Sequence, residues 1–112
     1  MEVRDFSMAA GDSKTLSVSV TEQSDDAATN IAGAAIAWKA ARSMRTTAAI
    51  SKSTSSGIVI TSGSGGTFDI TLDPADTSSL KGDYYHEAQI TFSTGEVATV
   101  LRGLMTIDPA LI

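Results

Sequence analysis

The most regular feature of the sequence is an alternation of apolar and polar residues with a period of two. It runs through residues 16–21, 67–72, 84–92 and 97–107. Because side chains point to opposite faces of a β-strand in turn, each of these segments predicts a strand with one buried face. The last two predict a hairpin that turns at Ser93-Thr94-Gly95-Glu96, where glycine tolerates a positive φ.

The alanine-rich segment 34–42 is ambiguous. Its propensity alone favours a helix, because alanine is the best helix former. However, Ile36, Trp38 and Ala40 also alternate with less apolar positions, and the flanking segments are strands. We therefore expect a central strand that carries Trp38 into the core.

The remaining segments fit the same pattern. Short strands are expected near residues 48–50 and 58–60, a loop at 62–66, and one helical turn after Asp73, which precedes a proline. Strands that recur about every ten residues with turn signals between them are typical of a sandwich. The sequence predicts a single all-β domain over residues 1–112, an antiparallel β-sandwich of seven to eight strands with one short helical turn.

Composition and charge exclude several classes of protein. The 112 residues include no cysteine and one histidine, so a disulfide scaffold, a thiolate zinc site, a cysteine nucleophile and a multi-histidine metal site are ruled out. The net charge of −5 has the wrong sign for a nucleic-acid-binding protein. No apolar run is long enough for a membrane span, and residues 1–5 lack the pattern of a signal peptide. We expect a soluble domain without nucleic-acid or membrane partners.

Candidate chemical groups have structural explanations. His86 is the one possible proton shuttle, but its place in the alternation puts it on the inward face of a strand. The Ser62-Gly63-Ser64-Gly65-Gly66 segment lacks the strand–helix setting of a nucleophile elbow. Asp25-Asp26 supplies too few oxygens for calcium, which takes about six to eight. We therefore expect no catalytic residue, no cofactor and no metal.

The order of the motifs is informative. Four motifs follow one another along the chain, namely an opening turn that leads into a strand, a strand with a tryptophan, a Leu-x-Gly-x-Tyr motif and a last strand. They are Gly11-Asp12-Ser13-Lys14-Thr15-Leu16, Ile36-Ala37-Trp38-Lys39-Ala40, Leu80-Lys81-Gly82-Asp83-Tyr84 and Gly103-Leu104-Met105-Thr106-Ile107. Over nearly the whole chain this resembles the small immunoglobulin-like modules of tailed bacteriophages, which include the N-terminal domains of baseplate upper proteins and short tail or neck proteins. The resemblance implies an immunoglobulin-like sandwich with a structural role.

Two residues are expected to have structural roles in such a sandwich. The Leu-x-Gly-x-Tyr spacing fits a tyrosine corner, in which the Tyr84 ring packs inside and its hydroxyl bonds back to the preceding backbone turn. Trp38 would pack on aliphatic residues alone, because the cysteine pair of antibody domains is missing.

Basic residues and apolar ends are the candidates for contact with partners. Four of the eight basic residues fall between positions 39 and 52, in a chain that is otherwise acidic. They form either an ordinary charged edge strand or a patch that docks on an acidic neighbour. The apolar ends, about residues 1–8 and 108–112, are expected to be terminal extensions that either pack across the sandwich or insert into a neighbour. The predicted contact residues are Lys39, Arg42, Arg45, Lys52, Leu111 and Ile112.

Together with the resemblance, these features predict a non-enzymatic structural protein of a phage tail, neck or baseplate. It would be made in the host cytoplasm, would reside in the virion, and would bind copies of itself and other virion proteins as a homo-oligomer. The alternative is a capsid decoration or host-surface adhesion module that contacts carbohydrate, with Tyr85 as the chief exposed aromatic ring.

Overall fold

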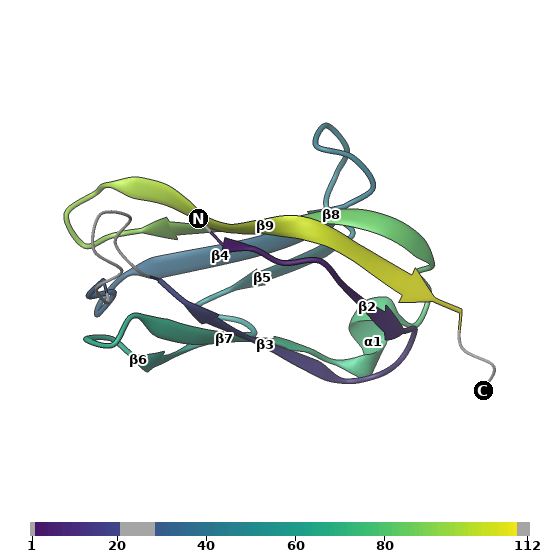
Figure 1. The fold of residues 1–112 in the computed structure, drawn as a ribbon, viewed down its shortest axis with the longest axis horizontal. Helices are drawn as coiled ribbons and strands as arrows, with labels where there is room; N and C mark the ends of the chain where they lie inside the picture. The colour runs from purple at the N-terminus through teal and green to yellow at the C-terminus, as the bar shows by residue number, and fades with distance from the viewer. Residues whose placement is uncertain (1, 21–28, 110–112) are drawn as a thin grey trace.

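Two β-sheets packed face to face make up the computed structural model, which describes residues 2–20 and 29–109 (Figure 1). The larger sheet has the order β1 (Glu2–Val3), β9 (Val97–Asp108), β8 (Gly82–Thr91), β4 (Ala35–Ala41) and β5 (Ile50–Ser53), and β2 (Phe6–Ala9) also pairs with β9. The smaller sheet has the order β3 (Lys14–Ser19), β7 (Thr67–Leu72) and β6 (Ile58–Ser62). Helix α1 (Pro74–Thr77) connects β7 to β8.

The strand order is that of an immunoglobulin-type sandwich. The all-β prediction is confirmed, as are the strand within 34–42, the hairpin turn at Gly95 and the helical turn after Asp73. The strand count and direction need correction: the described residues contain nine strands, and β1 and β2 run parallel to β9. In both parallel pairs the N-terminal segment lies along the last strand, β9, and runs in the same direction.

Of the two roles expected for the N-terminal segment, packing on the sandwich is the one observed. Residues 2–9 form β1 and β2, the side chain of Met8 is buried, and Phe6 packs against the core. Phe6 and Met8 thus complete the sandwich, whereas Val3 is exposed on the outer face of the larger sheet. Leu111 and Ile112 lie outside the described residues.

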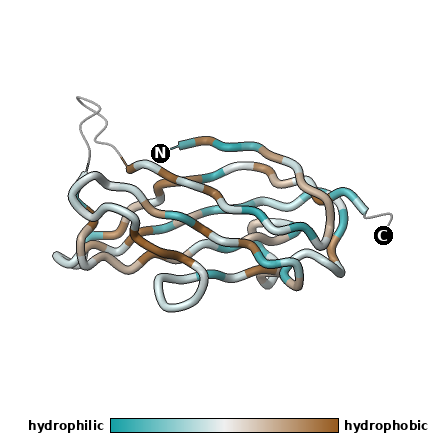
Figure 2. Tube along the Cα trace, turned by 90° about the horizontal axis from the view of Figure 1, so that it is seen from below, coloured by the Kyte–Doolittle hydropathy of each residue, from teal (hydrophilic) through white to brown (hydrophobic). Residues whose placement is uncertain are grey.

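The core lies between the inward faces of the two sheets, and hydrophobic and hydrophilic positions alternate along the strands that border it (Figure 2). Trp38 and Ile36 are buried on β4, whereas Ala37 and Lys39 on the same strand are exposed. Burial of the tryptophan between two sheets outweighs the helix propensity of the surrounding alanines. The other buried positions expected from the alternation are Leu16, Val18, Ile58, Phe68, Ile70, Tyr84, Ile90 and Leu101, while Ile60 and Phe92 are half-buried.

The alternation expected along 97–107 breaks once. The pairing of β8 with β9 slips between Leu101 and Thr99, so Val100 is buried and Val97 is exposed, whereas the sequence pattern placed Val97 on the same face as Leu101. A β-bulge adds one residue to one strand, which moves the side chains beyond it to the opposite face.

Candidate functional site

Lys52 belongs to the fold and not to an exposed basic patch. Its side chain points inward from the edge strand β5, is 10% exposed, and places Nζ 2.7 Å from a carboxylate oxygen of Asp76 in α1. Burial raises the pKa of Asp76, but the hydrogen bond and charge of Lys52 and the backbone N–H of Asp73 outweigh burial and lower the pKa overall. An inward-pointing charge on an edge strand also discourages the addition of another strand.

Arg42 likewise makes contacts within the fold. Its guanidinium lies 4.5 Å from the centroid of the Tyr84 ring and donates a hydrogen bond to the carbonyl of Lys81. The Tyr84 ring is buried, as predicted, but its hydroxyl makes no hydrogen bond within the described residues. The tyrosine-corner hydrogen bond is therefore not formed, and the ring is covered by a cation instead.

Lys39 and Arg45 are exposed, like Arg42, but within the described residues their side chains make no contact of the kind that holds Arg42. Neither makes an ion pair with any residue that the structure describes. Lys39 lies on the outer face of β4, and Arg45 lies in the loop between β4 and β5. Two of the four basic residues predicted to contact a partner thus keep side chains with neither an ion pair nor the contacts of Arg42 among the described residues.

His86, the one histidine, is held in the core. The indole N–H of Trp38 donates to His86 Nδ1 at 3.2 Å, and His86 Nε2 lies 2.7 Å from the carbonyl oxygen of Arg4. These partners fix the neutral tautomer with its proton on Nε2. Burial lowers the pKa of His86, although the Arg4 carbonyl and the carboxylates of Asp5 and Glu2 oppose that shift.

His86 occupies the position at which antibody domains have a disulfide-bonded cysteine. It follows Tyr84 by two residues, where an antibody domain has its second cysteine. The Trp38–His86 hydrogen bond and the edge-to-face contact of Phe6 with the imidazole, at 5.3 Å between centroids, occupy that part of the core. His86 is thus a structural residue, as the sequence predicted.

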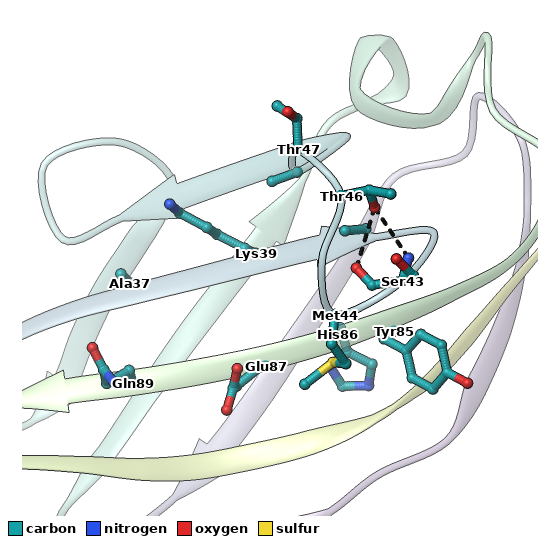
Figure 3. A pocket seen from close by; sticks show the side chains of 12 residues that line it. Ala37, Lys39, Ser43, Met44, Thr46, Thr47, Tyr85, His86, Glu87 and Gln89 are labelled. Carbon is teal, nitrogen blue, oxygen red and sulfur yellow. Dashed lines mark hydrogen bonds between the residues drawn. The ribbon is translucent and has the colours of Figure 1, made fainter.

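A hollow of about 510 Å³ lies on the outer face of the larger sheet, beneath the β4–β5 loop (Figure 3). Its floor includes Ala37 and Ala41 on β4, beside Lys39, with Glu87 and Gln89 on β8. The hollow exists because the two alanines leave the sheet bare on either side of the lysine. The hollow was not predicted from the sequence; the alternation of Ala37, Lys39 and Ala41 indicates its floor but not the loop that covers it.

The loop forms the other wall of the hollow. Met44 extends from it down toward β8, and the side chains of Thr46 and Thr47 stand above (Figure 3). Ser43 N–H donates to the Thr46 hydroxyl at 3.1 Å, and that hydroxyl donates to the Ser43 carbonyl at 3.2 Å. These bonds give the loop a defined shape.

Charges in the hollow are of both signs. Lys39 and Glu87 are directly paired positions on adjacent strands, but the Glu87 carboxylate binds Arg102 at 2.7 Å on its other side. Lys39 has no ion-pair partner among the described residues, so its ammonium group is available to a ligand.

Exposed large hydrophobic side chains concentrate on the same sheet. Of the six in residues 2–20 and 29–109, four lie on its outer face, and a fifth, Met44, lies on the loop above it. The sixth, Val59, lies on the outer face of the smaller sheet, paired with Asp69. The four on the larger sheet are Val3, Tyr85, Val97 and Leu104.

The described residues hold neither a cluster of metal-ligating side chains nor a long apolar helix. Within residues 2–20 and 29–109, no group of three or more acidic or histidine side chains could hold a metal ion. No helix in those ranges is long and apolar enough to cross a membrane. Asp25 and Asp26 lie outside the described residues.

Comparison with known proteins gives no family assignment. No family model matches the chain, and no curated protein matches it.

Proposed function

We propose that this chain is a non-enzymatic structural protein of a tailed-phage virion. It would act in the tail, neck or baseplate, present in several copies that contact one another and other virion proteins. The proposal rests on the resemblance of its motifs to phage immunoglobulin-like modules, together with the surface described above.

The main supporting observation is the uneven distribution of exposed apolar side chains. Four of the six found in the described part of the chain lie on the outer face of the larger sheet, and exposed apolar patches mark sites of protein contact. The smaller sheet instead presents mostly serine and threonine outward, with Val59 as its exposed large hydrophobic residue. One face of the sandwich is thus better suited to a protein contact than the other.

Several features of the edge strands disfavour the addition of a strand from another molecule, so a partner is more readily bound on a face of the sandwich. Lys52 points inward from edge strand β5, and β6 has a register shift between Ile60 and Ser62. The Arg4 guanidinium donates to the carbonyl of Ser17 on edge strand β3 at 2.7 Å. Such features discourage the pairing of another strand with an edge, which leaves the faces as docking surfaces.

The proposed function involves no catalysed reaction. His86 has both ring nitrogens engaged in the core, so it is not placed to move protons at a surface site. The protein would therefore act by shape and surface complementarity between copies.

The test is complementation in the phage or prophage that encodes the chain. A double variant, Val97→Asp with Leu104→Asp, changes two exposed residues on the outer face of the larger sheet and should fold normally. We expect it to fail to enter particles. Val59→Asp is the matched control, because Val59 is at least as exposed as Val97 and Leu104 but lies on the other sheet. Normal incorporation of the double variant, with normal particle yield, would refute the proposed contact surface.

A second candidate function is capsid decoration or host-surface adhesion through carbohydrate. The observation that favours it is the hollow beside Tyr85, which combines polar side chains with an apolar wall. Purified particles of a deletion strain would distinguish the two: loss of assembly supports the first function, whereas normal particles with weakened attachment support the second.

A further inference from the structure

The hollow on the outer face of the larger sheet is formed before any ligand arrives. The base of the β4–β5 loop is held by a 2.7 Å hydrogen bond from the N–H of Ala49 to the carbonyl of Ala40, and its tip by the bonds between Ser43 and Thr46. Preformed sites lose less conformational entropy on binding than sites that must be ordered. Its volume of about 510 Å³ is within the usual range for small-ligand sites.

The polar groups in the hollow define the chemistry of the ligand, and Glu87, whose Oε1 binds Arg102, still has its second carboxylate oxygen to offer. Lys39 offers donors only, Glu87 is an acceptor, and the Gln89 amide is both. Lys39 and the Glu87–Arg102 ion pair place donors and an acceptor side by side, so a ligand that both donates and accepts is matched better than one that does only one of these. Hydroxyl groups, which donate and accept at once, satisfy all three side chains.

The apolar part of the hollow completes the match. Ala37 and Ala41 leave a flat apolar floor beside the lysine, and Met44 forms a wall between the polar side chains and Tyr85 (Figure 3). A sugar ring carries hydroxyls at its rim and C–H groups on its faces, so it can contact both parts of this surface.

We propose that this hollow binds a neutral saccharide. Lys39, Glu87 and Gln89 hydrogen-bond its hydroxyls, and Met44 packs on one face of a ring. The inference specifies the site for the second candidate function and rests on that function, not on the virion assembly role. Because the hollow is open to solvent, we expect weak binding by one domain, with a Kd of about 1 mM; many copies would strengthen attachment by avidity.

The test is a titration of the intact, isotope-labelled protein followed by amide NMR shifts. The probes are maltose, lactose and N,N′-diacetylchitobiose, each to about 50 mM, which would detect a millimolar site. We expect at least one probe to cause saturable shifts confined to residues 37–48 and 85–89. A printed array of bacterial glycans, probed with a tetrameric form of the protein, extends the search.

Variants distinguish the site from general surface effects. Gln89→Ala and Lys39→Ala should each weaken binding about tenfold, because each removes a hydrogen bond to the ligand. Thr91→Ala is the matched control, since Thr91 is exposed on the same strand but does not line the hollow. It should leave the Kd unchanged.

Two results would overturn the proposal. One is the absence of saturable shifts with every probe and of any signal on the array. The other is saturation of the hollow by a zwitterionic dipeptide such as alanyl-alanine with no response to saccharides, which would assign it to peptide. Neither result bears on virion assembly, which the Val97 and Leu104 double variant tests separately.

Discussion

Replacing His86 by leucine tests the hydrogen bonds that join the core to the N-terminal segment. The Trp38 indole N–H is fully buried and would lose its acceptor, at a cost of about 1–3 kcal/mol. The half-buried Arg4 carbonyl would lose a bond contributing about 0.5–1.5 kcal/mol. We therefore expect His86→Leu to lower the free energy of unfolding by about 2–4 kcal/mol near neutral pH.

The assay is urea unfolding followed by the fluorescence of Trp38, the single tryptophan. Tyr85→Leu is the matched control: it is the neighbouring residue on β8 but is exposed, so its effect should stay within about 0.5 kcal/mol. A His86→Leu variant as stable as the wild type would refute the stabilising role of these hydrogen bonds.

The same site predicts a pH dependence. Burial lowers the pKa of His86 in the folded state, so as the pH falls through about 6.5 the unfolded chain takes up the proton first. Stability contributed by neutral His86 is thus fully present above that pH and is lost below it, by at most about 1.4 kcal/mol per pH unit. Unfolding midpoints measured at several pH values should show this decline in the wild type and not in His86→Leu. Equal slopes in both proteins would contradict the assignment.

Three further substitutions probe the packing. Asp76→Asn removes the ion-pair partner of Lys52 and should lower the free energy of unfolding by about 1–3 kcal/mol. Because the pKa of Asp76 is lowered in the folded state, the stability that its charge contributes is present above about pH 3.8 and is lost as the pH falls below it. The urea midpoint should therefore fall less in acid for the variant than for the wild type. Tyr84→Phe should change the free energy of unfolding by less than about 0.5 kcal/mol, because the Tyr84 hydroxyl has no hydrogen bond in the described residues. A larger loss in urea unfolding would indicate that the hydroxyl does make the tyrosine-corner hydrogen bond. Gly103→Ala would bring a Cβ into collision with the carbonyl of Arg4 and should lower the free energy of unfolding by about 1–3 kcal/mol. Amide hydrogen exchange in residues 2–9 should become faster, and unchanged exchange would show that this segment moves aside without losing its pairing.

Alternation in the sequence predicted most of the sandwich because period-two patterning is a local signal. It identified β3, β7 and β8 and placed Trp38 and His86 inside. It missed the bulge at Val100, because an extra residue in one strand depends on the partner strand and not on local pattern. It also missed the parallel pairing of β1 and β2 with β9, which joins residues about a hundred positions apart.

The candidate site was predicted only in part for a similar reason. Clustering of basic residues in the sequence indicated a patch, but Lys52 and Arg42 find partners in Asp76, Tyr84 and the Lys81 carbonyl, which lie more than twenty residues away. Only the three-dimensional arrangement shows that Lys39 keeps its charge available. The hollow beside it depends on a loop that folds back over the sheet, which no periodicity reports.

Quantitative mass spectrometry of gradient-purified particles tests the proposed virion role most directly. Particles from the phage or prophage that encodes the chain would be compared with a tail or baseplate protein of known copy number as the internal standard. The proposed function predicts that the chain is present in several copies per particle and stays bound through repeated purification. Its absence from particles, while the standard is recovered in full, would contradict the assignment.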